Sequence, residues 1–293
     1  MNIKTYLTAS FCLMLCLQLS AQHGLDFLQY QQTPMLINPA LTTNFNAEQR
    51  NRLSANYRFP GSSVFGNSQE HYGLIGYEHR LQLKNSSIGL GASHRLFYYD
   101  DSVNTNLFNS TRVALSYNKP LNSHSILSGG INVDFTSGYT SVGFGGAWKY
   151  YTNNQNNLTA GLALSDIRRG TSNLKGHVAF NFAATKKLRM EPNLLYQNFL
   201  SSAIINIHHI VAGNDFQWAL NDKQHLHLGI SYLYSSYHSE SFDRSDTFQS
   251  LLASVGYSNQ NFTIRVSYDD SVSDLTPVTY AGNRLEVATS FTF

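Results

Sequence analysis

Paired histidines are the residues in this sequence whose spacing first suggests a chemical role. His225 and His227 stand two positions apart, so on a β-strand both side chains point to one face, where two ring nitrogens could bind a metal ion. His208 and His209 are adjacent, so on a strand they point to opposite faces and cannot share one ion. We interpret the first pair as polar side chains of a strand face and predict no metal site.

Other groups that could do chemistry lack the spacing that the chemistry requires. The aspartates in or beside the two longest polar segments offer oxygen ligands for calcium, but without the spacing of an EF-hand loop: Asp243, Asp246, Asp269, Asp270 and Asp274. There is no Walker motif and no G-x-S-x-G elbow, and the sequence does not place a serine, a histidine and an acid together. We therefore predict no catalytic residues, no cofactor and no enzymatic activity.

The first 21 residues have the layout of a secretory signal peptide. Lys4 provides a short positive start, residues 6–17 are mostly apolar, and Ala21 is a small residue at the expected cleavage position. The apolar run is too short to span a bilayer. Both cysteines of the sequence lie in this segment, so the mature chain, which we expect to start at Gln22, has no disulfide and no thiolate ligand.

The composition favours a β-rich chain that contacts lipid or a ligand. Charged residues make up 13% of the 293 residues, about half of the roughly 25% usual in soluble domains, and aromatic residues make up another 13%. The formal net charge of +2 argues against a nucleic-acid binder, whose affinity depends on a basic face. After residue 21 the sequence has no run of 18 apolar residues, which excludes a transmembrane helix.

Apolar and polar residues alternate with a period of two along much of the mature chain, as in a strand whose two faces meet different surroundings. Many of these segments reach ten residues, which suits tilted strands that cross a bilayer in about 9–11 residues. Tyrosines lie toward the ends of the apolar stripes, as in the aromatic girdles of membrane barrels. The chain ends on Phe293, whose position resembles the insertion signal of bacterial outer-membrane proteins.

These segments predict an all-β fold, a transmembrane antiparallel β-barrel of about 14 strands, with 12 to 16 allowed by the less distinct connections. The strands are expected near residues 50–59, 70–82, 86–99, 107–118, 124–135, 140–151, 158–166, 175–185, 190–198, 203–220, 224–235, 247–257, 261–269 and 281–293. Short turns alternate with several longer polar connections, which is the arrangement that places the short turns and both chain termini in the periplasm.

The expected organisation is a signal peptide at 1–21, an irregular N-terminal arm at 22–48 and an outer-membrane barrel at 49–293. The arm does not alternate, and Pro34 and Pro39 each remove a backbone donor. Irregular backbone at membrane depth must be surrounded by protein or water. We therefore expect the arm to lie in the lumen or against the periplasmic rim.

Inward positions of the predicted strands carry charges of both signs, namely Asp134, Lys149, Arg265 and Glu286. This mixture fits either a polar pore or an interior closed by salt bridges. Gly89-Leu90-Gly91 and Gly143-Phe144-Gly145 lie in mid-strand, where glycine eases strand curvature or leaves lumen space and does not cradle a phosphate.

Short motifs at both ends of the mature chain occur in a recognisable order. An F-x-Q-Y sequence precedes N-P-A in the arm, Tyr57-Arg58 ends the first strand, and a Y-D pair precedes the closing segment with its glutamate. This order resembles the PorP/SprF family of the type IX secretion and gliding system of Bacteroidetes, over essentially the whole mature chain. The resemblance marks as candidate site residues Phe27, Gln29, Tyr30, Asn38, Pro39, Ala40, Tyr268, Asp269 and Glu286.

The resemblance implies a non-enzymatic outer-membrane component that docks, exports or anchors cell-surface cargo carrying a type IX C-terminal domain. It implies as partners that cargo, periplasmic lipoproteins or peptidoglycan-binding components, and outer-membrane lipid, but no nucleic acid. An alternative is a passive pore or a FadL-like carrier for small or hydrophobic molecules, because a barrel of this size can enclose a lumen. An outer-membrane hydrolase is a third alternative.

Overall fold

A computed structural model of the protein describes residues 33–45, 48–59, 69–100, 105–153, 156–168, 171–201, 205–239, 244–271 and 284–293. Antiparallel strands make up most of this part of the chain. They are β1 (Asn51–Phe59), β2 (Gln69–Gln82), β3 (Ser87–Asp100), β4 (Thr105–Asn122), β5 (Ser125–Thr136), β6 (Tyr139–Tyr151), β7 (Asn157–Arg168), β8 (Thr171–Ala183), β9 (Leu188–Ser201), β10 (Ile205–Asn221), β11 (Gln224–Ser239), β12 (Arg244–Ser258), β13 (Phe262–Ser271) and β14 (Arg284–Thr292).

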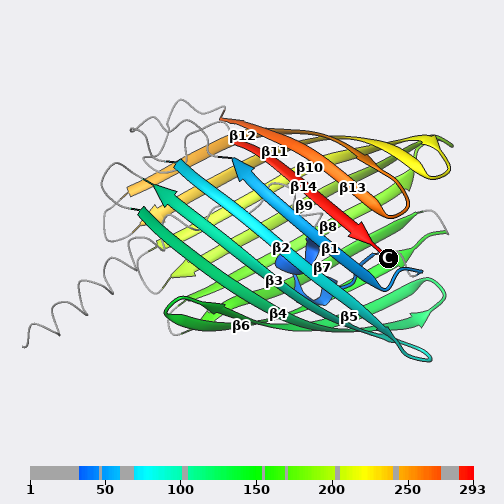
Figure 1. Ribbon diagram of the computed structural model, residues 1–293, viewed down its shortest axis with the longest axis horizontal. Coiled ribbons are helices and arrows are strands. Elements are labelled where there is room, and N and C mark those ends of the chain that lie inside the picture. Colours follow the sequence, from blue (N-terminus) through cyan, green and yellow to red (C-terminus); the bar gives the residue numbers. More distant parts are fainter. Residues whose placement is uncertain are drawn as a thin grey trace, which may run out of the picture.

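The strands form one closed barrel, in which each strand pairs with its sequence neighbours and β14 returns to β1 (Figure 1). At this seam Arg52 lies opposite Thr292 and Phe59 opposite Leu285, with a continuous antiparallel register between them. The prediction of a closed antiparallel barrel of about 14 strands is therefore confirmed. Because the barrel is closed, the backbone groups of each strand can form hydrogen bonds with neighbouring strands. Lipid offers no partner for these groups, so a closed sheet is the form that can span a bilayer.

Most strand boundaries agree with the sequence-based ones to within a few residues. The predicted end of the fourth strand at residue 118 was wrong, because β4 continues through Pro120 and ends at Asn122. A register shift between Pro120 and Asn122 accommodates the proline, which has no N–H to donate to the ladder. β8 also starts earlier than expected, at Thr171.

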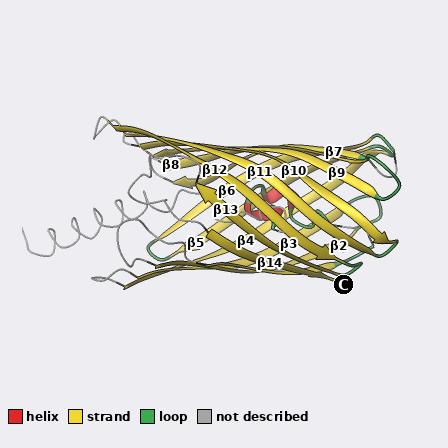
Figure 2. Cartoon of the chain, turned by 90° about the horizontal axis from the view of Figure 1, so that it is seen from above, coloured by secondary structure: helices red, strands yellow, loops and turns green. Residues whose placement is uncertain are grey.

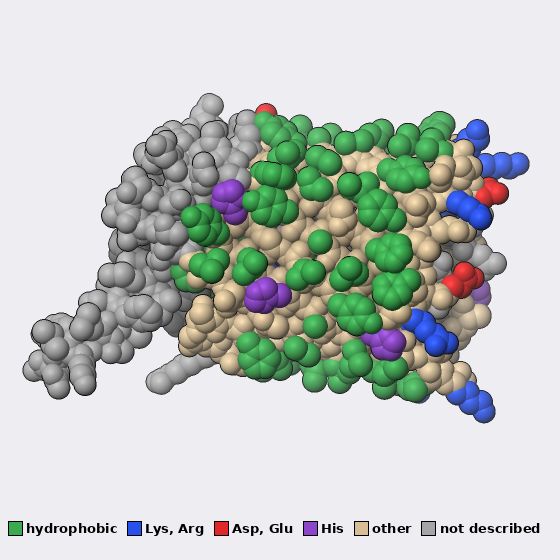
Figure 3. All heavy atoms as spheres, viewed as in Figure 1, with side chains coloured by type: hydrophobic (Ala, Val, Ile, Leu, Met, Phe, Trp, Pro, Cys, Tyr) green, Lys and Arg blue, Asp and Glu red, His purple; other side chains and the backbone are tan. Residues whose placement is uncertain are grey.

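The two ends of the barrel differ, and we name them by their connections. The turn end carries the short connections at residues 83–86, 123–124, 152–156, 184–187, 222–223 and 259–261, together with the C-terminal Phe293. In Figure 1 it lies on the right, where the C-terminus is marked. Exposed basic residues gather at this end: Lys84, Lys119, Lys186, Lys187 and Lys223 (Figure 3). The opposite end, the loop end, carries the remaining connections.

Apolar side chains cover the outside of the barrel as a broad belt (Figure 3). On β11, Leu228 is 58% exposed whereas the next inward residue, His227, is 6% exposed. The same alternation holds in β14, where Leu285 and Phe291 are exposed and Glu286 is buried. Exposed leucine, isoleucine and phenylalanine around a full circumference are unfavourable in water but match the hydrocarbon core of a bilayer.

The interior of the barrel contains a segment of the chain that precedes the first strand. Residues 33–45 form two single-turn 3-10 helices, η2 (Pro34–Leu36) and η3 (Pro39–Leu41), which lie within the ring of strands (Figure 2). We call residues 33–45 the lumenal arm. In the described ranges, no helix combines the length and apolar character needed to cross a bilayer.

The outward belt predicts a depth-dependent penalty for a charge. Leu162 lies near the middle of β7 and is 65% exposed, whereas Leu121 is 56% exposed beside the turn end of β4. Leu162→Arg should destabilise the barrel by about 2–4 kcal/mol, and Leu121→Arg by about 0–1 kcal/mol, because arginine near an interface reaches water. Urea unfolding in lipid vesicles measures both, and equal penalties would contradict the assignment of the belt to lipid.

Candidate functional site

The lumenal arm is the most deeply buried segment of the described chain. Thr33, Met35, Asn38 and Thr42 are all fully buried, although the arm belongs to no strand. Its local structure follows from its two prolines, which stand at the first position of each 3-10 helix, where a missing N–H is tolerated. The arm crosses the lumen and therefore needs partners on the wall for its polar backbone groups.

Asn38 joins the arm to the wall formed by β6 and β7. Its side-chain oxygen accepts a hydrogen bond from the Ala40 N–H (2.9 Å), which caps η3. Its Nδ2 donates to the carbonyl oxygens of Gly146 (3.0 Å) and Leu162 (3.2 Å), which lie opposite each other on neighbouring strands. One asparagine thus both shapes the arm and fixes it to the barrel.

Two cations hold the carbonyl groups at the end of η2. Arg112 Nη1 on β4 donates to the oxygens of Leu36 (2.9 Å) and Met35 (3.3 Å). Lys175 Nζ on β8 donates to the same Leu36 oxygen (3.1 Å). The last carbonyls of a helix have no partner within it and carry partial negative charge, so cations stabilise them.

Asp134 on β5 fixes the orientation of Arg112. The contact is bidentate, with Arg112 Nε 2.7 Å from Oδ1 and Nη2 2.9 Å from Oδ2, and both side chains are buried. Asn132 Nδ2 also donates to Asp134 Oδ2 (2.7 Å). This geometry leaves Arg112 Nη1 directed at the arm, so the ion pair orients the group that donates to the arm carbonyls.

A second group of wall residues holds the end of the arm nearest β1. Glu78 Oε2 accepts from the Thr43 N–H (2.5 Å), while Glu78 Oε1 accepts from Arg52 Nε (2.8 Å). Arg80 donates to the Thr43 carbonyl and to the Phe45 carbonyl (2.8 Å). The guanidinium groups of Arg52 and Arg80 lie 5.1 Å and 4.7 Å from the centre of the Phe45 ring, within cation–π range.

Thr43 has a left-handed backbone conformation, with φ of 66°. For a β-branched residue this conformation is strained and costs about 1–3 kcal/mol, so it persists only where the surroundings impose it. Glu78 holds the N–H of Thr43 and Arg80 holds its carbonyl. The strain therefore shows that contacts with the wall determine the conformation of the arm at this point.

Inward-facing glycines give the arm the space that it occupies. A Cβ on Gly130 of β5 would overlap the backbone of Pro39 and Ala40, and one on Gly145 of β6 would overlap the Asn38 side chain. A Cβ on Gly91 of β3 would lie 2.8 Å from Met35 Sδ. The sequence-based interpretation that mid-strand glycines leave lumen space thus holds for Gly91 and Gly145.

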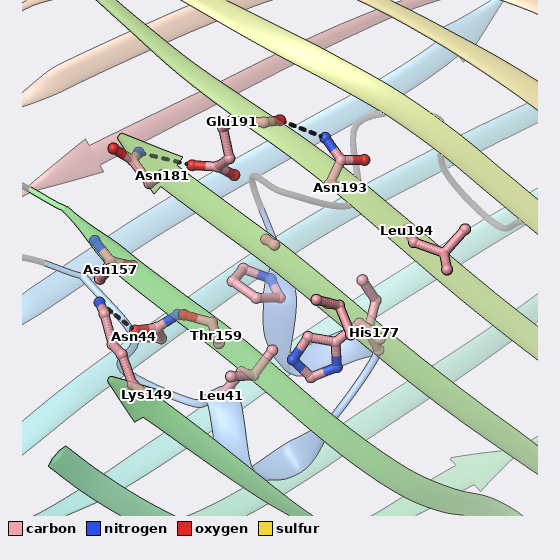
Figure 4. Close-up of a pocket in the computed structure, with 14 residues that line it drawn as sticks. Leu41, Asn44, Lys149, Asn157, Thr159, His177, Asn181, Glu191, Asn193 and Leu194 are labelled. Carbon is pink, nitrogen blue, oxygen red and sulfur yellow. Dashed lines mark hydrogen bonds between the residues drawn. The ribbon is translucent and has the colours of Figure 1, made fainter. Parts of the chain in front are cut away.

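A cavity of about 270 Å³ separates the arm from the wall of β6 to β9. The apolar residues of the arm that line it are Pro34, Ile37 and Leu41. Figure 4 shows Leu41 among the polar residues of the wall. The wall contributes mostly polar residues, namely Lys149, Asn157, Thr159, His177, Asn181, Glu191 and Asn193, together with Val178, Ala179 and Leu194.

Hydrogen bonds fix several of the polar groups around this cavity. Glu191 accepts from Asn181 (2.9 Å), and Lys149 lies 3.4 Å from the Asn44 side-chain oxygen. Neither ring nitrogen of His177 has a hydrogen-bond partner within the described part of the chain. The size and polarity of the space suit water or a small polar solute.

The inner surface also contains an apolar region, which we call the apolar inner wall. It consists of buried, inward-facing residues of β9 to β12: Leu195, Phe199, Ile207, Val211, Leu233, Phe248 and Leu252. Ile37 of the arm forms one cluster of buried side chains with five of them, namely Leu195, Val211, Leu233, Phe248 and Leu252. Six of the seven wall residues lie in the halves of their strands nearer the loop end, and Leu252 lies just past the middle of β12. Buried polar side chains, such as Gln197, His209 and Ser250, alternate with them on the same face, so the apolar inner wall is a local region and not one half of the lumen.

A serine, a histidine and an aspartate meet on the inner face of the barrel, nearer the turn end. His227 Nε2 lies 2.7 Å from Ser258 Oγ, and His227 Nδ1 lies 3.7 Å from Asp215 Oδ2. Arg265 Nη2 is 2.7 Å from His227 Nδ1 and 2.5 Å from Asp215 Oδ2. A guanidinium only donates, so Nδ1 accepts and the proton of the neutral ring is on Nε2.

His227 therefore donates to Ser258 and does not accept from it. A nucleophilic serine needs the opposite arrangement, with a ring nitrogen that accepts its proton. The contacts link β10, β11, β12 and β13 on the inner face of the barrel, which is a structural role.

The two histidine pairs lie as the strand pattern predicts. His225 shares the face of His227. His208 and His209 point to opposite faces, since His208 contacts Tyr196 outside and His209 is buried inside. Within the described residues, no group of three or more metal-binding side chains comes together.

The motif residues fall into two separate regions. Asn38, Pro39 and Ala40 form the centre of the lumenal arm. The other described motif residues lie on β13 and β14: Tyr268 faces outward, Asp269 pairs with Arg284 (2.5 Å), and Glu286 pairs with Arg58 across the β1–β14 seam (3.2 Å). Phe293 is 54% exposed at the turn end. Phe27, Gln29 and Tyr30 lie outside the described residues.

The sequence reasoning missed most of the wall residues that hold the arm. These residues come from four strands, β1, β2, β4 and β8, and none forms a motif: Arg52, Glu78, Arg80, Arg112 and Lys175. One signal was present, because strand alternation places each of them on the inward face. The sequence did not predict the position of each residue along the barrel axis or the path of the arm through the lumen.

The neighbouring glycines of β5 provide a matched test of the arm contacts. Gly130 faces the arm, whereas a Cβ on Gly129, which faces outward, would meet nothing within 4 Å. Gly130→Ala should cost about 1–3 kcal/mol through overpacking, while Gly129→Ala should be neutral or slightly stabilising. Thermal unfolding in detergent micelles measures the difference. Equal stability of the two variants would mean that the arm does not occupy this part of the lumen.

No protein-family profile and no curated protein matches the sequence. Among solved structures, an outer-membrane channel from Pseudomonas putida F1 has a TM-score of 0.52 at 8% identity, over 84% of this chain and 96% of the other. A bacterial polysaccharide outer membrane secretin has a TM-score of 0.50 at 10% identity, over 85% of this chain and 100% of the other. A KdgM porin in complex with disordered oligogalacturonate has a TM-score of 0.44 at 13% identity, over 82% of this chain and 99% of the other. The likeness to the first two structures concerns the fold alone. Together with the closed barrel and its apolar belt, it supports an outer-membrane β-barrel.

Proposed function

We propose that this outer-membrane barrel docks partner proteins as a component of a type IX secretion system. In this role it exports or anchors cell-surface cargo that carries a type IX C-terminal domain, and it contacts lipoproteins or peptidoglycan-binding components in the periplasm. The turn end faces the periplasm and the loop end faces the cell surface, which follows the usual arrangement of short and long connections in such barrels. The order of the family motifs in the sequence supports the role in type IX secretion.

The observation that carries the proposal is the lumenal arm. Its backbone is bound by Arg112 and Lys175 on one side of the lumen and by Glu78 and Arg80 on another. An open pore would need this irregular segment to be absent or weakly held. A barrel whose lumen is filled by its own chain instead presents two outer rims for contact with other proteins.

The alternative of a passive pore or a carrier for hydrophobic molecules requires displacement of the arm. The apolar inner wall would suit an apolar solute, but Leu195 and Val211 are already buried and Ile37 of the arm belongs to their cluster. Displacing the arm would also break its contacts with charged wall residues. We therefore favour the docking role.

We also propose that the protein is not an enzyme. Among the described residues, the set Ser258, His227 and Asp215 comes closest to a catalytic arrangement. Arg265 gives the histidine the tautomer that cannot take a proton from the serine. The hydrogen bonds of this set support a structural role in the wall.

Conductance of the purified barrel in a planar bilayer tests the docking role against the pore. The full mature chain should show no steady current, whereas a variant that lacks residues 33–45 should conduct. Gly130→Ala should give intermittent opening, and Gly129→Ala should behave like the unchanged protein. A steady, large-ion current through the folded, unchanged protein would favour the passive pore and overturn the closed-lumen role.

Loss of the gene tests the link to secretion. In the source organism, its deletion should remove one or more type IX cargo proteins from the cell surface, and a plasmid carrying the gene should restore them. A pull-down from detergent-solubilised outer membranes should recover the same cargo or periplasmic lipoproteins, identified by mass spectrometry. If every such cargo reaches and stays on the surface in the deletion strain, the export and anchoring role is wrong.

A further inference from the structure

The cavity between the lumenal arm and the wall of β6 to β9 contains two opposite charges that do not meet. Lys149 of β6 and Glu191 of β9 both line it, and Figure 4 shows them apart from each other. Lys149 Nζ lies 3.4 Å from the Asn44 side-chain oxygen and 5.3 Å from the centre of the Tyr151 ring. The Glu191 carboxylate accepts from Asn181 (2.9 Å). Neither charge forms an ion pair within the described part of the chain, so each can still gain from an opposite charge in the cavity.

The polar side of this cavity lies close to the turn end of the barrel. Lys149 stands two residues before the end of β6, Asn181 two residues before the end of β8, and Glu191 three residues after the start of β9. All three occupy inward positions of their strands, and all three are partly exposed. An inward side chain at this level meets solvent through the lumen. A solute from the turn end can therefore reach both charges while the arm stays in place.

The remaining lining and the size of the cavity limit what it can hold. Its volume of about 270 Å³ equals that of about nine water molecules, at about 30 Å³ each in the liquid, so a solute of about ten non-hydrogen atoms fits. Asn157, Thr159 and Asn193 offer amide and hydroxyl groups, while Ile37 and Leu41 of the arm offer apolar surface. A matching solute has hydrogen-bonding groups, some apolar surface and charges of both signs.

Other classes of small solute match the two charges less well. A neutral sugar or polyol would leave both Lys149 and Glu191 without a counter-charge. A simple anion would meet the carboxylate of Glu191, and a simple cation would meet the ammonium group of Lys149, each at a cost from like charges. A single α-amino acid carries both charges, but on one carbon atom, whereas the two wall charges lie apart.

We propose that the cavity binds a small zwitterion whose charges lie at its two ends, of the class of a dipeptide with free termini. The carboxylate of the dipeptide faces Lys149, its ammonium group faces Glu191, and its peptide group faces the amide side chains of the wall. Its apolar side chains face Ile37 and Leu41 of the arm. This site does not depend on the proposed role in secretion, because it requires only the barrel and the bound arm.

Isothermal titration calorimetry of the full mature chain in detergent, with L-alanyl-L-alanine as the probe at neutral pH, tests the proposal. The dipeptide should bind saturably with a Kd below about 1 mM. Its N-acetyl form lacks the ammonium group and its C-terminal amide lacks the carboxylate. Each should bind about 10- to 100-fold more weakly, because each loses one charge-assisted contact.

Two variants connect each end of the dipeptide with one wall residue. Lys149→Gln should bind the dipeptide and its amide about equally, and Glu191→Gln should bind the dipeptide and its N-acetyl form about equally, because the contact that distinguishes them is absent. The matched controls are Lys187→Gln and Asp222→Asn, which remove exposed charges in turns at the same end and should bind like the unchanged protein. Each variant is first shown to be folded by its heat-modifiable mobility in gel electrophoresis.

Three results would overturn the proposal. Absence of saturable binding to folded protein at millimolar dipeptide would mean that the cavity holds water alone. Equal binding of the dipeptide, its N-acetyl form and its amide to the unchanged protein would mean that the two charges do not select the solute. Binding that Lys187→Gln or Asp222→Asn weakens as much as the cavity variants would place the dipeptide on the outer rim.

Discussion

An irregular backbone inside a barrel must find a partner for each polar group, and this requirement explains the composition of the wall. The carbonyls that end η2 lie against Arg112 and Lys175, and the Thr43 N–H lies against Glu78. Where the arm approaches the sheet most closely, the wall residue is a glycine, as at Gly130. Charge and space on the inner surface thus follow the path of one short segment.

The inner surface of the barrel also contains one apolar region. Most of the wall carries ion pairs and hydrogen-bonded networks, such as Arg265 with Asp215 and Glu191 with Asn181. On β9 to β12, however, buried leucine, valine and phenylalanine side chains form one cluster with Ile37 of the arm. A water-filled channel would favour polar residues along its whole length. This cluster instead resembles the core of a soluble domain, to which the arm contributes a side chain.

Alternation predicted the strands, and their length, the tyrosines near the ends of the apolar stripes and the terminal Phe293 favoured a membrane barrel over a soluble β-sandwich. In β14, Leu285 and Phe291 point outward and Glu286 inward as the pattern requires, and similar patterns located almost every strand. The exceptions have local causes, such as the bulge that lets β4 continue past Pro120. The arm contacts were not predictable in this way, because Asn38 reaches Gly146 and Leu162 across more than a hundred residues. Periodicity reports which face a side chain lies on, but not which residue stands opposite across the lumen.

The arm and the ion pairs of the wall depend on each other. In a water-filled lumen, a pair such as Arg112 with Asp134 would behave like an exposed salt bridge, worth about 0–1 kcal/mol. The arm excludes water from this pair, which strengthens the attraction but also removes the hydration of both groups. That loss is tolerable because Arg112 gains the carbonyl oxygens of Met35 and Leu36 as further acceptors. The arm carbonyls thus replace the water that Arg112 lost, and Arg112 replaces the water that the carbonyls lost. We therefore expect the barrel wall and the arm to become rigid together.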